Sequence, residues 1–545
     1  MTRQSWGVGL AKILDILVWG WVGLILIYLA WGRLEIKNCS GLDFPDLGLA
    51  ATLVIRMGLT RYLPWESAAW HHYWTRLVSC LMARPRLTLG IISFLYFWAF
   101  FGVAALQHWA FRSSVDLGNF CQALWSTLQG EIMYSSVRGF NMLGDHLVAI
   151  LFLLVPLYAV FPNPYTVLFI QTLALASGAA AVYLLAKDET GRLDAALGLG
   201  LVYLCHPTVF NMSLMDFHPI ALATPLWLWA LALRRKRPLV AGILAVLALS
   251  CSEESWIFLV GFGLYTLLGR RKVWQGLSFT ALGMAGFLVV TGLVIPSINP
   301  GGSYHIHQTH FPHLGPDLTS AFVTLISKSS FLLSHILTAS KMWYVVTLLA
   351  SVLFLPLAAP WSLVLFAPIV AGNLLSDHAY MWSLDRHYSA CVIPGLFWGA
   401  AMGWRNLLKK SRVQKIPATG VLAVAALAAL ISLDQSPLGN MRRLLQQDPS
   451  DAYAIVQALP EGAPVAAQPI FLPHLARNMN MSRFPWIPKD IPYITICTEK
   501  DPWPYSKQEL IALVGRLKSQ GYRVKVQKGS CLLLHKPPRS GSPSP

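Results

Sequence analysis

Acidic and histidine side chains gather in five short segments of an otherwise strongly apolar chain. A carboxylate can act as a general base on an acceptor hydroxyl. Carboxylates and imidazoles can also hold a divalent cation that neutralises a phosphate leaving group. In chain order the segments contain Asp116; Asp145 and His146; Asp216 and His218; Glu253 and Glu254; and a last pair of loops with His305, His307, His310, His313, His378, Tyr380, Asp385, Arg386, His387 and Tyr388.

These segments can be assigned candidate roles by residue type. Asp116 is the candidate catalytic base or metal carboxylate. The candidate ligands of a divalent metal, Mg²⁺ or Mn²⁺, are Asp145, His146, Asp216, His218, Glu253 and Glu254. Candidate phosphate- or sugar-binding residues are Tyr380, Arg386, His387 and Tyr388.

Each segment also has a simpler interpretation. Asp116 is a residue type that caps a juxtamembrane helix. Asp216 and His218 stand ahead of a helix that could start at Pro219. Glu253 and Glu254 could be solvent-facing turn residues, and the histidine-rich stretch could be a solvated loop. The functional interpretation rests on all five segments lying on one side of a membrane, which depends on the topology of the chain.

Composition points to a membrane protein. Of 545 residues, 55% are hydrophobic and 12% are charged, against about 25% charged in soluble domains. So little charge cannot cover a water-facing surface, which excludes a soluble enzyme and disorder over most of the chain. The apolar runs are continuous rather than alternating, which disfavours a β-barrel. The sequence therefore predicts an all-α polytopic membrane protein.

Basic residues set the predicted orientation. The net charge of +17 comes from clusters between apolar runs, such as RRKR at 234–237, which are typical of cytoplasmic loops rather than of nucleic-acid binding. We expect about 12–13 transmembrane helices in the plasma (inner) membrane. The clearest spans are 87–107, 163–186, 194–210, 218–233, 274–296, 342–358, 361–376, 388–405 and 416–433, with 16–32 expected to span and 48–60 ambiguous.

Two apolar runs need a separate interpretation. The run 238–269 is too long for one crossing, so we expect two short helices that meet at Cys251–Glu254. The run 147–161 has only 15 residues and contains Pro156. If it crossed the membrane, every later loop would change sides and RRKR would face outward, so we expect an in-plane helix in the outer leaflet.

Composition changes after residue 433. The segment 434–536 contains helix-like DAYAIVQALP and KQELIALVGRLKSQG and strand-like IPYITIC, YRVKVQ and CLLLHK, which predicts a small extracytoplasmic α/β domain. Cys497 and Cys531 lie in two of the strands and could pair in an oxidising compartment. We expect the domains 1–80 (an N-terminal extension with one or two membrane helices), 81–433 (transmembrane, with outer loop 108–146 and in-plane helix 147–161), 434–536 (α/β) and 537–545 (disordered tail).

Several motifs resemble a family of prokaryotic multi-pass membrane proteins of unknown function, grouped with GT-C-type glycosyltransferases. They are VDLGNFCQALW at 115–125, GDHLVAILFLLVPLYAVFP at 144–162, MDFHPIALATPLWLWAL at 215–231, SEESW at 252–256, DRHYSACVIPGLF at 385–397 and PVAAQPIFLPHLARN at 464–478. The resemblance covers most of the chain beyond about residue 80. It departs at Ser252-Glu253-Glu254, where related sequences tend to have Lys-Glu-Asp.

The resemblance implies a GT-C-like fold and sugar transfer from a polyprenyl-phosphate carrier on the outer face of the membrane. It places the acidic residue of the first outer loop at Asp116. It also implies juxtamembrane helices before the next crossing, which agrees with the in-plane helix expected at 147–161 from the sides of the later loops. The expected function is transfer of a sugar from a polyprenyl-phosphate donor to an unknown acceptor. The alternatives are a transporter or flippase of a lipid-linked substrate, or a non-catalytic membrane assembly protein.

Overall fold

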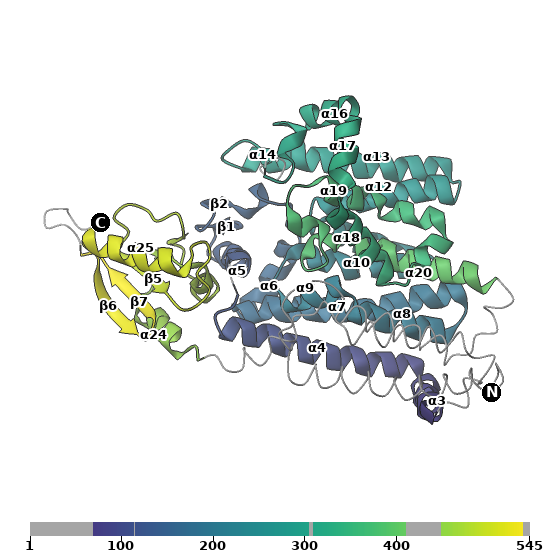
Figure 1. The fold of residues 1–545 in the computed structure, drawn as a ribbon, viewed down its shortest axis with the longest axis horizontal. Coiled ribbons are helices and arrows are strands. Elements are labelled where there is room, and N and C mark those ends of the chain that lie inside the picture. The colour runs from purple at the N-terminus through teal and green to yellow at the C-terminus, as the bar shows by residue number, and fades with distance from the viewer. Residues whose placement is uncertain (1–68, 114, 305–308, 410–447, 538–545) are drawn as a thin grey trace, which may run out of the picture.

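The computed structural model describes residues 69–113, 115–304, 309–409 and 448–537. A long body of helices ends in a small C-terminal domain with one sheet, and the two are joined around helix α5 (Val115–Leu128) (Figure 1). The predicted segments 16–32, 48–60 and 416–433 and the tail from residue 538 lie outside the described residues.

Long apolar helices form the frame of the body. In the described part of the chain, three are long and apolar enough to cross a membrane: α4 (Pro85–Trp109), α7 (Pro164–Thr190) and α13 (Val273–Val289), which continues to Ile298. Helices α8 (Leu193–Cys205) and α9 (Pro207–Leu214) together are also long and apolar enough to cross, but they are bent by 47° at the break between them, as in a broken span or a re-entrant loop. The break at His206 interrupts a segment that the sequence predicted as one span.

Shorter helices complete the body. They are α3 (Ala69–Ala83), α10 (Pro219–Leu233), α11 (Pro238–Leu249), α12 (Glu254–Leu264) and α20 (Val392–Leu408). The prediction that 238–269 forms two helices is confirmed, because the chain breaks between Leu249 and Glu254. Helix α6 (Leu151–Val160) spans only ten residues, about 15 Å at 1.5 Å per residue, half the roughly 30 Å needed to cross hydrocarbon.

The predicted regular spans 342–358 and 361–376 are wrong in detail. Helix α18 (Ala339–Ala350) stops early, two short 3₁₀ turns follow, and α19 (Ala367–Leu375) begins only after them. Leu353 and Phe354 both have φ of 55°, a conformation that ends a helix. Pro356 and Pro360 start the two 3₁₀ turns and cannot donate a backbone hydrogen bond.

Helix α7 lies at the centre of the body and packs against α4, α8, α10 and α20. A side chain at Gly178 would collide with the Tyr203 hydroxyl, 2.2 Å from the ideal Cβ position, so only glycine permits this approach of α7 to α8. That hydroxyl donates to the Leu175 carbonyl at 3.0 Å. Small residues let helix backbones approach closely in membranes.

At its end α7 carries the buried carboxylate of Glu189. The carboxylate accepts hydrogen bonds from Arg234 at 3.2 Å, from Arg405 and from the Trp398 indole at 3.1 Å. These partners follow α10 or lie on α20, so one carboxylate joins three helices. Glu189 is 2% exposed at its side chain, and a buried charge is tolerated only when it is paired in this way.

The C-terminal domain has a five-stranded sheet in the order β4-β3-β5-β7-β6. Strands β3 (Val465–Ala467), β4 (Met481–Arg483) and β5 (Tyr493–Cys497) are parallel, and β7 (Cys531–His535) is antiparallel to β5 and to β6 (Arg523–Lys528). Helices α24 (Ser450–Ala458) and α25 (Lys507–Ser519) match the predicted helices. The sequence interpretation did not contain strands β3 and β4, which have only three residues each.

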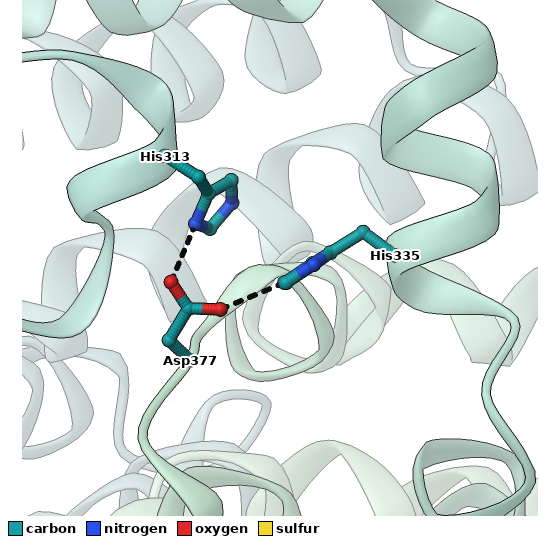
Figure 2. Close-up of side chains that lie close together, drawn as sticks. All are labelled: His313, His335 and Asp377. Atoms are coloured by element: carbon teal, nitrogen blue, oxygen red, sulfur yellow. Dashed lines mark hydrogen bonds and ion pairs between the residues drawn. The ribbon is translucent and has the colours of Figure 1, made fainter.

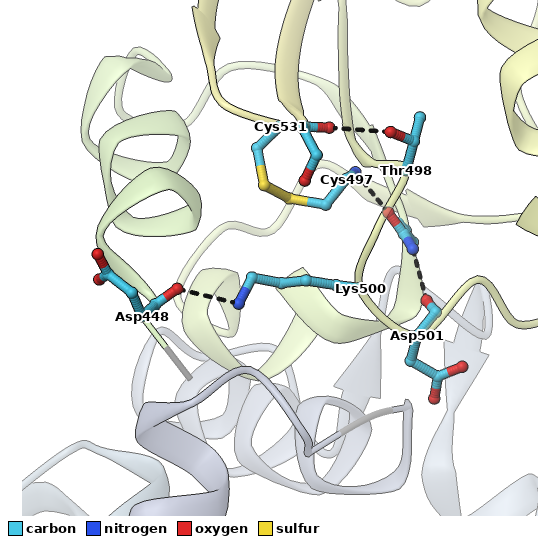
Figure 3. The surroundings of a disulfide bond; sticks show 8 residues. Asp448, Cys497, Thr498, Lys500, Asp501 and Cys531 are labelled. Carbon is cyan, nitrogen blue, oxygen red and sulfur yellow. Dashed lines mark hydrogen bonds between the residues drawn. A yellow bond between two sulfur atoms is a disulfide. The ribbon is translucent and has the colours of Figure 1, made fainter. Parts of the chain in front are cut away.

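A disulfide joins neighbouring strands of this sheet. Cys497 and Cys531 are bonded and pair directly in the register of β5 and β7 (Figure 3). Beside them, Gln468 accepts from the Cys497 amide at 2.7 Å and donates to the Asp501 carbonyl at 2.6 Å. The described cysteines outside this domain are free.

The Glu189 network predicts a local stability effect. We expect Glu189→Ala to lower the stability of the protein in detergent by about 3 kcal/mol, because two guanidinium groups lose their buried partner. The midpoint of thermal unfolding measures it. Lys236→Ala is the matched control: its ion pair with Asp188, one residue before Glu189 on α7, is exposed on the lysine side, so it should change stability by less than about 1 kcal/mol. Equal effects of the two substitutions would contradict the assignment.

Candidate functional site

A cavity of about 290 Å³ lies where all five of the acidic and histidine-containing segments meet. It is bounded by α5, by the turn after the β1 (Tyr134–Ser135) and β2 (Phe140–Asn141) hairpin, by the start of α10 and by the break between α11 and α12. The loops after α14 (Ile295–Ile298) and α19 close it. Its charged and aromatic lining residues are Asp116, Phe120, Arg138, Asp145, His146, His218, Glu253, Glu254, Tyr304, His310, His387 and Tyr388.

Asp116 and His218 form an ion pair at the cavity wall. Asp116 lies in the first turn of α5, and its Oδ2 is 3.2 Å from His218 Nε2. The other ring nitrogen, Nδ1, is 2.8 Å from the Asp216 carbonyl, while Gln171 accepts from the His218 amide at 2.9 Å. A carbonyl and an ionised carboxylate both accept, so His218 carries protons on both nitrogens while Asp116 is ionised.

The environment fixes the charge state of Asp116. Burial alone would favour the neutral acid, but the hydrogen bond and positive charge of His218, with further help from the charge of Arg138, lower the pKa of Asp116 far below its usual range. Nevertheless, 47% of the side chain is exposed. Asp116 is therefore an ionised carboxylate that a substrate in the cavity can reach.

His387 stacks on His218, with ring centroids 3.9 Å apart. Burial and the adjacent imidazolium hold the pKa of His387 well below its usual value. His387 is thus a neutral ring, able to donate from one nitrogen and accept at the other. It begins the short 3₁₀ turn His387–Ser389 ahead of α20.

A second ion pair connects His146 with Glu253. His146 Nδ1 is 2.8 Å from Glu253 Oε1, and the same carboxylate accepts from the Leu147 amide at 3.1 Å and the Tyr304 hydroxyl at 2.7 Å. Burial disfavours the imidazolium, but the charge of Glu253 and its hydrogen bond raise the pKa of His146 to about 9. This side of the cavity therefore carries a second histidine cation.

The remaining charged groups are Arg138, Asp145 and Glu254. Arg138 Nη2 lies 3.0 Å from Asp145 Oδ2, and Asp145 is 1% exposed at its side chain. Within the described residues, the buried Nε of Arg138 and the buried Oε2 of Glu254 have no hydrogen-bond partner. Burial and the charge of Glu253 raise the pKa of Glu254 to about 8, so the cavity wall contains one guanidinium with an unpaired N–H and one carboxyl group that is neutral near pH 7.

Not every predicted site residue reaches the cavity. The Asp216 carbonyl contacts His218 Nδ1 and the charge of Asp216 favours the His218 cation, but Asp216 is outside the lining of the cavity. Tyr380 and Arg386 lie next to the cavity, where the guanidinium stacks 4.6 Å over the phenol ring, while His387 and Tyr388 line it. Among the described residues, the six predicted metal ligands do not converge into a group of three; they are engaged mainly in ion pairs.

Arg138 and Tyr304 are lining residues that the sequence interpretation did not single out. Tyr304 donates to the Glu253 carboxylate, from which it is 51 residues away in the sequence. Arg138 precedes Asp145 by seven residues in the predicted outer loop, and it is a basic residue in a loop otherwise poor in Lys and Arg. A single basic residue in such a loop was the feature of the sequence that could have identified Arg138 as a site residue.

The C-terminal domain supports the helix that carries Asp116. The segment Pro469–Leu475 packs on α5, and Gly118 faces Leu472, which an ideal Cβ at Gly118 would approach to 2.8 Å. Gln122 of α5 donates to the Asn478 carbonyl at 2.7 Å. His108 and His474 stack with centroids 4.3 Å apart at the same junction. The position of Asp116 therefore depends on contacts with this domain.

Comparison with solved structures shows a common fold. ArnT from Cupriavidus metallidurans bound to undecaprenyl phosphate matches with a TM-score of 0.51 and 14% sequence identity, over 83% of this chain and 99% of ArnT. ArnT from the same organism in the apo state gives a TM-score of 0.47 at 13% identity, over 80% of this chain and 97% of ArnT. The first match, together with the largely helical body and the small C-terminal sheet, confirms the GT-C-like fold class.

Comparison with curated proteins found no match. The sequence from residue 107 to residue 529 matches a family described as "Predicted membrane protein (DUF2079)". That range contains the whole cavity and most of the C-terminal domain. The predicted membership of a family of multi-pass membrane proteins is therefore confirmed, the likeness to GT-C-type proteins is one of fold, and the chain belongs to the DUF2079 family of membrane proteins.

Proposed function

We propose that this protein is a GT-C-type glycosyltransferase that moves a sugar from a polyprenyl-phosphate donor to an acceptor hydroxyl. The observation that carries the proposal is the ionised, accessible Asp116 held against the His218 imidazolium in a cavity with two further cations. The fold shared with ArnT supports it, since that structure is of a protein bound to undecaprenyl phosphate. Polyprenyl phosphate would thus be the lipid partner.

In the proposed reaction the acceptor oxygen forms a bond to the anomeric carbon as the bond from that carbon to the phosphate oxygen breaks. The acceptor proton passes to Asp116, and the lipid phosphate leaves with the bonding electron pair. Asp116 is a weak base because His218 stabilises its charge. A weak base suffices when the sugar develops oxocarbenium character, because the attacking hydroxyl becomes strongly acidic as its bond forms.

Three cations are available for the phosphate. Arg138, His146 and His218 line the cavity, and the free Nε–H of Arg138 adds a directed donor. Positive groups arranged before the reaction stabilise the charge that develops on the leaving phosphate. These three cations can bind the phosphate in place of the lysine that related sequences tend to have at the position of Ser252.

A divalent cation remains part of the proposal in a limited form. Asp145 and Glu253 are already ion-paired, so Glu254 is the cavity carboxyl group with an available oxygen. We assign Glu254 to contact with Mg²⁺ or Mn²⁺ brought with the donor phosphate, or with a sugar hydroxyl. Tyr388 and the neutral His387 provide hydrogen bonds to the sugar.

The proposed location is the plasma (inner) membrane, with the cavity and the C-terminal domain on the extracytoplasmic side. The support is the contrast between the basic loops, such as 234–237, and the acidic cavity at the opposite ends of the same helices. The break at 250–253 also suits a transporter. In this structure, however, that break contributes Glu253 and Glu254 to the same cavity as Asp116, which favours an enzyme.

Replacement of the proposed base should abolish turnover. We expect Asp116→Asn to lower the release of lipid phosphate at least about 100-fold, because the amide cannot accept the acceptor proton. The purified protein is supplied with a panel of polyprenyl-phosphate sugars, with Mg²⁺, Mn²⁺ or EDTA. Slow hydrolysis by water needs no added acceptor.

The control for that experiment is Asp188→Asn, a surface carboxylate near the far end of α7. It should turn over like the wild type. Normal turnover by Asp116→Asn removes Asp116 from the reaction. If the folded wild type releases phosphate from none of the donors, the transferase proposal fails, and movement of lipid in liposomes would test the transporter.

Removal of the Arg138 guanidinium, whose Nε has no hydrogen-bond partner among the described residues, should affect donor binding more than chemistry on a bound donor. We expect Arg138→Gln to raise the donor KM about tenfold or more, since a charge-assisted bond to phosphate contributes roughly 1.5–3 kcal/mol. Steady-state kinetics over a range of donor concentrations measures the change. Arg523→Gln, on an exposed strand of the C-terminal domain, is the matched control. An unchanged KM in Arg138→Gln would contradict phosphate contact.

The topology has a direct chemical test. In cells carrying the protein with Cys39 and Cys80 replaced by serine, Ser519→Cys at the exposed end of α25 should react with a membrane-impermeant maleimide. Lys236→Cys, in the basic loop after α10, should react only after the membrane is permeabilised. The reverse pattern would place the C-terminal domain in the cytoplasm.

A further inference from the structure

A second cluster of ligand-type side chains lies outside the cavity. His313 comes from the 3₁₀ turn η5 (Pro312–Leu314), His335 from the end of α17 (Ser329–Ile336) and Asp377 from the loop after α19. The two imidazoles each face a different oxygen of the carboxylate (Figure 2). The sequence interpretation included His313 in a histidine-rich loop but not His335 or Asp377.

The distances fit a common ion. His313 Nδ1 lies 2.9 Å from Asp377 Oδ2, and His335 Nε2 lies 3.3 Å from Asp377 Oδ1. One atom from each of the three residues falls within 4.8 Å of the others. Ligand atoms of a tetrahedral ion with bonds of about 2.0–2.1 Å are about 3.3 Å apart. A small inward movement of the side chains would thus complete three coordination positions.

We infer that His313, His335 and Asp377 form a zinc-type metal site with three protein ligands and an open fourth position. Two imidazoles and one carboxylate suit Zn²⁺ or a similar transition metal, whereas Mg²⁺ prefers an all-oxygen set. The site is separate from the cavity carboxylates, and it does not depend on the proposed sugar transfer.

Backbone contacts hold the carboxylate in place. The Asp377 amide donates to the His310 carbonyl at 2.9 Å, and the Ser376 hydroxyl donates to the same carbonyl at 3.2 Å. Fixed outer contacts of this kind orient metal ligands. They also join the two loops that would share the ion.

The position of the site gives it a structural role. An ion would join the loop with His313 and helix α17 to Asp377. Asp377 precedes the cavity-lining residues His387 and Tyr388 by ten and eleven residues. His310, three residues before His313, lines the cavity itself. We therefore expect metal binding to order the wall of the cavity that is built by these loops.

One nearby cation opposes binding. Lys341 on α18 is 5% exposed and acts electrostatically on both His335 and Asp377. Its Nζ has no hydrogen-bond partner among the described residues, so the ammonium does not occupy the carboxylate. We expect Lys341→Met to tighten metal binding by removing this repulsion.

Metal binding to the full-length protein in detergent tests the site. After removal of bound metal with EDTA, we expect about one equivalent of Zn²⁺ to bind and to raise the unfolding temperature, and Co²⁺ to give the strong visible absorption of a tetrahedral site. His313→Ala should weaken Zn²⁺ binding at least about tenfold. Asp377→Asn keeps the shape of the side chain and should do the same.

The control is the double variant His305→Ala/His307→Ala, which removes neighbouring histidines of the same sequence stretch and should bind as the wild type does. Size-exclusion chromatography identifies variants that fail to fold, and in that event Asp377→Asn carries the test. The site is rejected if micromolar Zn²⁺ does not bind to the wild type, if folded His313→Ala or Asp377→Asn binds it unchanged, or if only the control variant loses it.

Discussion

The cavity depends on balancing three ion-paired carboxylates inside a largely apolar helical body. An isolated buried charge is costly, and a partner removes most of that cost. Asp116, Asp145 and Glu253 therefore each face a cation, namely His218, Arg138 and His146. Pairing also determines reactivity: it keeps Asp116 ionised, makes two histidines cationic, and leaves His387 neutral because it stacks on one of them. Glu254, the carboxyl group without such a cation among the described residues, is the group left to meet a ligand.

These ion pairs form because several helices of the body end next to the cavity. The chain leaves helical conformation between α9 and α10 and between α11 and α12, and those two breaks supply His218 and the Glu253–Glu254 pair. Proline begins α10 at the first of these breaks, where its missing N–H costs nothing. Irregular backbone at membrane depth is stable only where protein or a water-filled cavity satisfies it. The helix breaks therefore line the cavity, and the cavity in turn allows the helices to be broken there.

Hydropathy was sufficient to predict most of the body, because twenty apolar residues have few other stable arrangements. It also located the break at 250–253, since one crossing cannot hold 32 residues. It failed at 342–376, where Leu353, Phe354 and the prolines end the helices inside an apolar stretch. The ion pairs were beyond sequence reasoning for a different reason: His146 and Glu253 are 107 residues apart, and their segments meet only in the folded chain, where the Ile150 amide donates to the Ser250 carbonyl at 2.9 Å. Strands β3 and β4 are too short to show a period.

The C-terminal domain belongs to the site as much as the helices do. Helix α5 is 14 residues long, and an isolated helix of that length is marginal in water. Its position is fixed by Leu472 against Gly118 and by the bond from Gln122 to Asn478. Both partners lie in the C-terminal domain, whose sheet is closed by the Cys497–Cys531 disulfide. A movement of this domain would shift Asp116 relative to His218, which is held by Gln171 of α7. The C-terminal domain is therefore mechanically connected to the accessible carboxylate at the cavity wall.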